Sequence, residues 1–471
     1  MSSSTSAAST SAASTSALMP GPGALDRDPM WAARLAFESR RRTSINTVVQ
    51  EIRQGKRAIT GVFKRAACAC ASDEMCWQGA CTTTPTLTFP EDEIQVATQL
   101  VGVVAAADTS INVLVDASAG ADARQAALAV AGKFASTFAL ELEIVGLAGH
   151  TGGVDRDGDG RLTVVFTNTE SSFIDTNNVG FFSHRDFLSA GDSDASGNQA
   201  DLLWARIPAT VINGRALSDI TLAGTLAHEY LHLASFGIRV QNRPSDPLQE
   251  ILWLDEGLAH LVEDLTGWGP SNVRPTEAAL LGWADGPFAG PEDTSEQRGR
   301  AYLLLRHMVD TAAKSATAEH AATHIAHEAA ASLVSSLLAE AKVGWEHQAL
   351  QNLGSDGVWH WLLGVFSSCN AGVTSSAALA HSYLPRGKSA ITGNHMGFDP
   401  FGEYSDDRGD SVVFGGVSSE ELDDSNDGDD YEVALGGTAL FTVLGSDGTG
   451  VDIVQDVDNP LLVVAKKQQI R

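Results

Sequence analysis

The segment at residues 221–237, TLAGTLAHEYLHLASFG, constrains the fold of this chain more than any other. Apolar residues surround its centre, Asp219 stands where it can cap the start of a helix, and a glycine stands where it can end that helix. His228 and His232 are four residues apart, so both imidazoles project from one face, with Glu229 to the side. The segment therefore predicts an interior helix that carries three polar side chains close together.

The two histidines of this helix are spaced for a metal ion. At this separation, two imidazole nitrogens can reach one Zn²⁺ at about 2.0–2.1 Å, and Glu229 can take a proton from metal-bound water. The alternative is that the histidines and the glutamate simply pair with one another on an amphipathic helix. Because H-E-x-x-H is short enough to arise by accident in a chain with 13 histidines, the interpretation depends on a third ligand.

A third ligand is offered by residues 253–263, WLDEGLAHLVE, which form a second helical pattern. A catalytic zinc takes three protein ligands and keeps one open position. Glu256 follows the second histidine after 23 intervening residues, which lets its helix pack beside the first. The longer H-E-x-x-H-x-x-G-x-x-H pattern is excluded, because Ser235 and Ile238 occupy its glycine and histidine positions. Glu256 is therefore the predicted third ligand.

HEYLH followed by WLDEGLA resembles the gluzincin clan of zinc metallopeptidases, and its surroundings are most similar to the hyicolysin-type neutral metallopeptidases. The resemblance covers about residues 110–310. It includes VDRDGDGRLTVVFTN (154–168), VGFFSHRDF (179–187), NQADLLW (198–204) and RGRAYLLLRHMVD (298–310).

This resemblance implies a zincin-like catalytic domain, with a mixed sheet and helices, that is secreted or on the cell surface and cleaves proteins or peptides. It implies His228, His232 and Glu256 as zinc ligands and Glu229 as the general base. The first 20 residues, a Ser/Ala/Thr repeat, contain neither the charged start nor the apolar core of a secretory signal.

The chain departs from the family pattern at two places. Thermolysin-like relatives carry an aspartate four residues after the ligand glutamate, where it orients a zinc histidine, whereas His260 stands here. The second-shell hydrogen bond must then come from elsewhere. The tyrosine of gluzincin aminopeptidases is also missing from its place, where Glu296 stands. Tyr302 is a substitute candidate for stabilising an oxyanion, and the alternative is that it merely packs within its helix.

Composition excludes some classes of partner. The chain has 59 acidic and 31 basic side chains and a formal charge of −28, so its surface repels phosphate backbones and anionic lipids. The sequence contains no run of about 18 uninterrupted apolar residues, the length that a membrane span needs. We therefore expect a protein or peptide substrate, with no nucleic-acid partner and no membrane span.

The order of the predicted elements indicates an α+β fold. Strands come first, and long helical patterns dominate from residue 219 to about residue 380, which is unlike a repeating βαβ sheet. The predicted strands are 111–115, 140–147, 162–167 and 202–207, and an alanine-rich helix is predicted at 121–139.

Composition also divides the chain into three parts. Residues 1–85 hold the low-complexity repeat, expected to be disordered, a basic stretch at 30–62 and a cysteine cluster. The basic stretch predicts one or two helices that act as a propeptide or an interaction arm, or that simply have a solvated face. Residues 86–400 are the predicted metallopeptidase domain. Residues 401–471 are acidic and glycine-rich, which predicts a small β-rich module with short strands such as 439–444 and 451–454.

Four of the five cysteines, Cys68, Cys70, Cys76 and Cys81, lie within 14 residues, and Cys369 stands alone. In an exported protein such a cluster indicates two disulfides, with three possible connectivities. The alternative is a zinc site, which the C-x-C-x5-C-x4-C spacing fits poorly.

The alternating aspartates Asp155, Asp157 and Asp159 in DRDGDGRLT match the start of an EF-hand calcium loop. The twelfth position is Phe166 instead of the usual bidentate glutamate. These residues therefore predict either a Ca²⁺ site or a tight turn without an ion.

Two other functions compete with a zinc peptidase. One is a catalytically silent surface or binding protein on a zincin scaffold, although a silent relative has no need of Glu229. The other is a deformylase-type hydrolase, whose third ligand is a cysteine in an E-G-C-L context that this sequence lacks.

Overall fold

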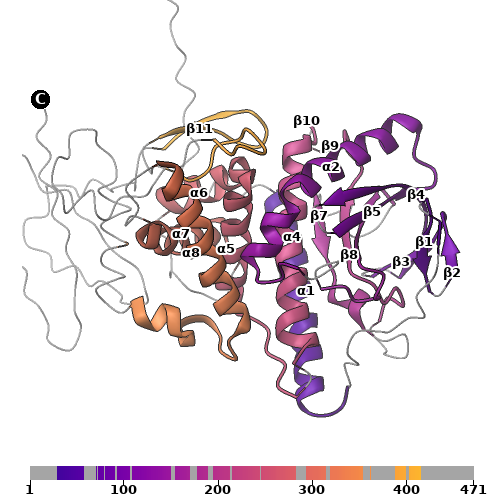
Figure 1. Ribbon diagram of the computed structural model, residues 1–471, viewed down its shortest axis with the longest axis horizontal. Helices are drawn as coiled ribbons and strands as arrows, with labels where there is room; N and C mark the ends of the chain where they lie inside the picture. Colours follow the sequence, from indigo (N-terminus) through magenta and orange to yellow (C-terminus); the bar gives the residue numbers. More distant parts are fainter. Residues whose placement is uncertain are drawn as a thin grey trace, which may run out of the picture.

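The structure is a computed structural model that describes residues 29–57 and 70–414 with internal gaps, and for 29–39 and 319–326 the backbone alone. The gaps are 72, 79, 91–92, 107–108, 150–153, 170–177, 189–194, 213–214, 244, 283–292, 314–318, 354–360, 362–387 and 399–401. Within the described part, one curled mixed sheet lies beside a group of helices (Figure 1). The predicted α+β class is confirmed.

Six of the described strands form the main sheet, in the order β3-β4-β5-β6-β8-β7. Strands β5, β6 and β8 are parallel to one another, and β7 closes the order antiparallel to β8. Three of the four predicted strands are present, as β5, β6 and β8. The strands are β3 (Thr86–Phe89), β4 (Ile94–Ala106), β5 (Thr109–Asp116), β6 (Arg161–Thr167), β7 (Gly180–Phe182) and β8 (Leu202–Arg206).

The strand predicted at 140–147 is wrong, because helix α2 (Ala121–Ile144) continues through most of it. Phe134, Phe138 and Leu142 recur every four residues, and all three are buried. This helical spacing outweighs the local β propensity of the segment's last residues, since the α2 face packs in the main core.

Both faces of the sheet are buried. One face packs with α2 and the later helices in the main core, through residues such as Val113 and Val164. The opposite face, with Leu114 and Val165, packs in a smaller cluster against β3 and the hairpin of β1 (Met75–Trp77) and β2 (Ala80–Thr82). The sheet is therefore a rigid wall beside the helices.

The later helices carry most of the polar side chains discussed below. Helix α4 (Asp219–Phe236) packs against α2, β7 and α5 (Leu252–Glu263), and α7 (Ser295–Ala313) packs against α5. The Ser218 hydroxyl, rather than Asp219, caps α4 by accepting from the Thr221 N–H at 3.0 Å. The other helices are η1 (His184–Phe187), η2 (Gly237–Gln241), η3 (Asp264–Trp268), η4 (Gly269–Asn272), α6 (Val273–Leu281), α8 (Glu319–Ala339) and η5 (Gly344–Glu346).

The basic N-terminal stretch forms helix α1 (Pro29–Arg53), which confirms the predicted helix up to Arg53. The two helices α1 and α4 overlap in the view of Figure 1, and Arg41 of α1 contacts Glu229 of α4. The buried apolar side chains of α1 belong to the main core, so α1 is packed into the protein rather than solvated on all sides: Ile45, Val48, Val49 and Ile52.

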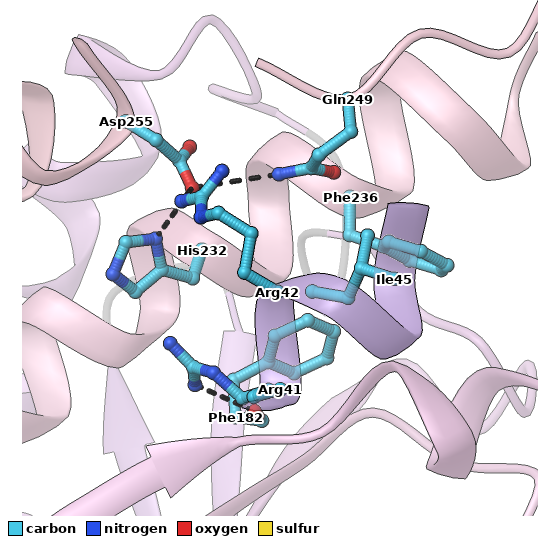
Figure 2. Close-up of a pocket in the computed structure, with 8 residues that line it drawn as sticks. All are labelled: Arg41, Arg42, Ile45, Phe182, His232, Phe236, Gln249 and Asp255. Atoms are coloured by element: carbon cyan, nitrogen blue, oxygen red, sulfur yellow. Dashed lines mark hydrogen bonds and ion pairs between the residues drawn. The ribbon is translucent and has the colours of Figure 1, made fainter. Parts of the chain in front are cut away.

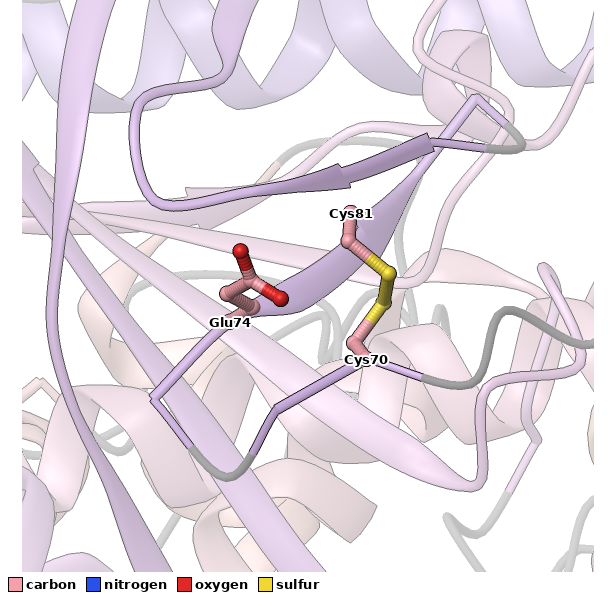
Figure 3. A group of neighbouring side chains, drawn as sticks. All are labelled: Cys70, Glu74 and Cys81. Atoms are coloured by element: carbon pink, nitrogen blue, oxygen red, sulfur yellow. A yellow bond between two sulfur atoms is a disulfide. The ribbon is translucent and has the colours of Figure 1, made fainter.

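A disulfide joins Cys70, in the segment before β1, to Cys81 on β2 (Figure 3). Cys76 is also disulfide-bonded. The disulfide interpretation is therefore confirmed for these residues, and Glu74 beside them has no thiolate with which to share a metal. Cys68 and Cys369 lie outside the described residues.

The C-terminal part is described up to residue 414. Its strands β11 (Glu403–Ser405) and β12 (Ser411–Val413) form a hairpin, and Phe414 packs into the main core. The strands predicted at 439–444 and 451–454, and the repeat at residues 1–28, lie outside the described residues. The three-part division of the chain stays a prediction. A further hairpin joins β9 (Val211–Ile212) and β10 (Arg215–Ala216).

Among the described residues, no helix combines the length and the apolar character required to cross a bilayer.

Candidate metal centre

Helices α4 and α5 bring the three predicted metal ligands together. The Nε2 atoms of His228 and His232 are 3.1 Å apart. Glu256 places one carboxylate oxygen 3.3 Å from Nε2 of His228 and the other 3.6 Å from Nε2 of His232. All three residues are buried, with exposed fractions of 4% or less. The predicted convergence of residues from two helices is therefore present.

The spacing of these atoms fits a metal ion. Ligands held tetrahedrally at about 2.0–2.1 Å from one ion stand about 3.3 Å apart, close to the three separations between His228, His232 and Glu256. Two imidazole nitrogens and a carboxylate converge here in a buried place, and facing lone pairs of this kind need a shared cation or protons. The group is positioned to hold a metal ion.

Two further carboxylates lie near the Nδ1 atoms of the histidines, on the side of each ring away from the Nε2 atoms that face the metal group. Asp255 lies 3.2 Å from Nδ1 of His232, and Glu263 lies 3.5 Å from Nδ1 of His228. The hydrogen bond with Asp255 fixes the orientation of the His232 ring and raises the basicity of the nitrogen that faces the metal. Glu263 makes no hydrogen bond with His228 and adds negative charge beside it. Asp255 therefore supplies the orienting contact that His260 does not provide.

Helix α5 is held in place by close packing and by an arginine. A Cβ atom added to Gly257 would lie 2.6 Å from the Ala301 Cβ on α7, so the two helices approach too closely for any larger residue. Arg298 on α7 lies 2.8 Å from the Glu256 carboxylate. Its guanidinium also donates to both carboxylate oxygens of Asp293 at 2.6 Å. The carboxylate of Glu256 is therefore fixed on the side of α7.

The surrounding carboxylates make this place favourable for positive charge. Burial alone lowers the pKa of His228, but the neighbouring carboxylates of Glu256 and Glu263 outweigh burial and raise that pKa to about 10. A cation between the two histidines is stabilised by the same negative field.

Glu229 lies beside the metal group, between the sheet edge and α1. Its Oε2 accepts from the backbone N–H of Phe182 on β7 at 2.9 Å and from the Arg41 guanidinium at 3.0 Å. Burial raises the pKa of Glu229, whereas Arg41 and the two histidines lower it, and the net shift is downward. Glu229 is therefore held as a carboxylate.

His260 has its own partners. Its Nδ1 lies 2.6 Å from Oδ1 of Asn272 and 2.9 Å from Glu263. His228, His260 and Glu263 form a second group with metal-binding spacing, but in it His260 and Glu263 are already engaged with each other.

The structure does not bring Tyr302 into the metal group. Its hydroxyl donates to Asp264 at 3.1 Å, and Asp264 is also paired with Arg306. The buried ring of Tyr302 packs edge-on against Phe398. This is the packing alternative to the oxyanion role, and that role stays a prediction that no contact supports.

A second group of carboxylates lies in the segments directly before strands β6 and β8. Asp155, Asp157 and Asp201 place ligand atoms within 4.8 Å of one another. Asp159, the third predicted residue, is engaged elsewhere, because it accepts from the Arg161 N–H at 2.7 Å and from Asn112 at 3.2 Å. The group therefore contains Asp201 in place of Asp159.

Asp201 faces its acidic neighbours with a free oxygen. One of its oxygens accepts from the Arg156 N–H at 3.0 Å, and the other is buried and has no hydrogen-bond partner within the part of the chain that is described. Burial, followed by the negative charge of Asp157, raises the pKa of Asp201 well above its usual value. A cation would relieve this concentration of buried negative charge.

Neither a scan against family models nor a search of curated proteins finds a match for this chain.

Several residues of these two sites were not predicted from the sequence. Asp255 and Glu263 lie within residues 253–263, the segment that contains Glu256. Carboxylates so near a predicted ligand could have been predicted to contact the histidines. The other contacts join distant parts of the chain and left no local signal: those of Arg41, Arg298 and Asp201.

Proposed function

We propose that this protein is a zinc-dependent peptidase. The observation that carries the proposal is the convergence of His228, His232 and Glu256 at separations that suit one tetrahedral ion, with Glu229 beside them. A set of two imidazoles and one carboxylate leaves the fourth position open, as in catalytic rather than structural zinc sites. Nitrogen and oxygen ligands in this number favour Zn²⁺ over Mg²⁺ or Ca²⁺.

The chain's own residues would divide the work as follows. His228, His232 and Glu256 hold the ion, which when bound polarises the scissile carbonyl and makes water more acidic. Glu229 takes a proton from the attacking water and passes it to the leaving amine. The N–H of Phe182 keeps the Glu229 carboxylate oriented during this transfer.

We further propose that the group of Asp155, Asp157 and Asp201 holds Ca²⁺. Three carboxylates without nitrogen or sulfur ligands suit a hard cation. The turn that carries the first two has positive φ at Gly158 and Gly160, which lets the chain fold back on itself. An ion here would tie that turn to the start of β8 and so support the sheet behind the metal centre.

A second candidate function, a catalytically silent binding protein, is favoured by one observation. Arg41 occupies an oxygen of Glu229, the group that the reaction needs as a base. A permanently engaged base would leave a protein that binds zinc and cleaves nothing.

Zinc content and cleavage of labelled casein, measured on the same preparations, separate these candidates. We expect one zinc per chain and slow cleavage by the wild type. Glu229→Gln should keep the zinc and lose cleavage, and Glu256→Ala should lose both. Glu143→Gln, on the exposed side of α2, is the matched control and should change neither. Full zinc in the wild type, with no cleavage by the wild type or by any of the variants, would favour the silent protein.

A further inference from the structure

Helix α1 lies across the metal centre and contacts the groups that the proposed reaction needs. The Arg41 guanidinium donates to the carbonyl oxygen of Phe182 at 2.7 Å (Figure 2). It also donates to the Glu229 carboxylate at 3.0 Å. The side chain of Arg41 is 5% exposed, so both contacts are shielded from water. One residue of α1 thus occupies both the proposed base and the backbone of the strand beside it.

The next residue of α1 contacts the other side of the site. Arg42 reaches the Asp255 carboxylate at 2.5 Å and the carbonyl oxygen of Glu250 at 2.8 Å. Asp255 is the carboxylate that orients His232 (Figure 2). The two adjacent arginines therefore link α1 to both flanks of the metal group.

Where the structure describes both α1 and the His232 side of the metal group, the cavity between them is too small for a peptide. The cavity lined by Arg41, Arg42, Phe182, His232 and Asp255 has a volume of about 10 Å³. This is space for about one water molecule, whereas pockets for even small ligands measure some hundreds of Å³.

The contacted backbone is also where an extended peptide could pair with the sheet. Among the strands that the structure describes, β7 is the last in the sheet order. Peptides commonly add to such an edge through main-chain hydrogen bonds. The carbonyl oxygen of Phe182 is taken by Arg41 and its N–H by Glu229.

We propose that α1 is an intramolecular inhibitor that, while docked, seals the metal centre against substrate through Arg41 and Arg42. The proposal rests on the proposed function. Opposite charge drives the docking, because the two arginines meet Glu229 and Asp255, whereas the apolar side chains of α1 that pack in the main core hold the helix in register. Release of α1 from the site frees the base, the carbonyl oxygen of Phe182 and the space that a peptide needs.

The test compares the full-length zinc-loaded wild type with Arg41→Gln/Arg42→Gln. Arg53→Gln is the matched control, since it is an arginine of the same helix whose contacts are with residues 246 and 247. Three quantities are measured: hydrogen exchange of the amides of residues 41–53, the rate of zinc transfer to a chromogenic chelator, and the cleavage of labelled casein. We expect the double variant to exchange faster and to raise zinc transfer and cleavage by about tenfold or more, since each buried charged hydrogen bond contributes on this scale.

The three measurements distinguish failure of this proposal from failure of the peptidase assignment. Faster exchange and faster zinc transfer without cleavage would support the seal and overturn the peptidase. Unchanged zinc transfer and unchanged cleavage in a variant whose α1 exchanges faster would overturn the seal. A loss of cleavage in the double variant, with zinc transfer as in the wild type, would also overturn it, because Arg41 would then assist the reaction. Arg41→Gln alone provides the same comparison if the double variant does not fold.

Discussion

Asp255 lies 3.2 Å from Nδ1 of His232, although it stands directly before Glu256 in the sequence. Two consecutive residues of α5 thus contact the same metal group. Glu256 is a candidate ligand, and Asp255 contacts the candidate ligand His232. Asp255 lies in the first turn of α5, where the free N–H groups favour negative charge. The segment WLDEG therefore supplies both a ligand and the support for another ligand.

Asp255→Asn should weaken zinc binding by about 10- to 100-fold, because an amide cannot strengthen the basicity of His232 as a carboxylate does. Equilibrium competition with a chelator measures this. Asp246→Asn is the control, since its side chain is 67% exposed. Equal affinities for Asp255→Asn and the wild type would show that this contact does not tune the metal.

The proposed calcium site distinguishes Asp201, which the structure places in the carboxylate group, from Asp159, which the sequence predicts. Calcium should raise the melting temperature of the wild type by a few degrees, since an ion that binds only the folded state stabilises it. Asp201→Asn should abolish this rise, whereas Asp159→Asn should keep it. Thermal melts at constant zinc, with and without millimolar calcium, measure both. If Asp159→Asn abolished the rise and Asp201→Asn kept it, the ion would be bound by Asp155, Asp157 and Asp159, as the sequence predicts.

His184 should make the protein less stable in acid. Burial, followed by Arg185, Arg41 and Arg57, lowers the pKa of this histidine from 6.5 to about 3. The unfolded chain binds a proton below pH 6.5 that the folded chain does not bind until about pH 3. The free energy of unfolding is therefore unaffected above pH 6.5. Between pH 6.5 and pH 3 it falls, by up to about 1.4 kcal/mol per unit.

Urea unfolding at pH 7.5 and pH 5.5 tests this contribution. His184→Asn should lose less stability between the two values than the wild type loses. An identical fall in stability for both proteins would contradict the assignment to this histidine.

Gly257→Ala should destabilise the protein by about 1–3 kcal/mol, because the added methyl group collides with Ala301 and overpacks the α5–α7 contact. Gly132→Ala on α2 is the matched control, since its Cβ would meet nothing within 4 Å. That change should stabilise the protein by about 0.5–1 kcal/mol. Chemical denaturation measures both, and equal signs would contradict the packing argument.

The sequence predicted the centre of the site because the information is local. Helical spacing places His228 and His232 on one face, and the second helical segment carries Glu256. Composition and element order were likewise sufficient for the α+β class. The error at 140–147 arose because short apolar segments have similar patterns in strands and buried helices, and α2 shows its helical spacing only over its full length.

The surroundings of the site were not predictable in the same way. Arg41 and Glu229 are separated by 188 positions, and Asp201 lies 45 positions from the backbone N–H that it accepts from. Their approach depends on how the sheet, α1 and α4 pack together, which no local spacing encodes. The basic charge of α1 was visible in the sequence, but the acidic site that it meets exists only after folding.

The zinc absorption-edge spectrum of the metal-loaded protein tests the central claim most directly, since it reports the atoms around the ion. We expect nitrogen and oxygen neighbours at about 2.0–2.1 Å with the scattering of two imidazoles. Glu256→Ala should lose the bound zinc, and Glu229→Gln should keep both the zinc and the spectrum. Sulfur neighbours, or full zinc with an unchanged spectrum in Glu256→Ala, would contradict the metal centre of His228, His232 and Glu256.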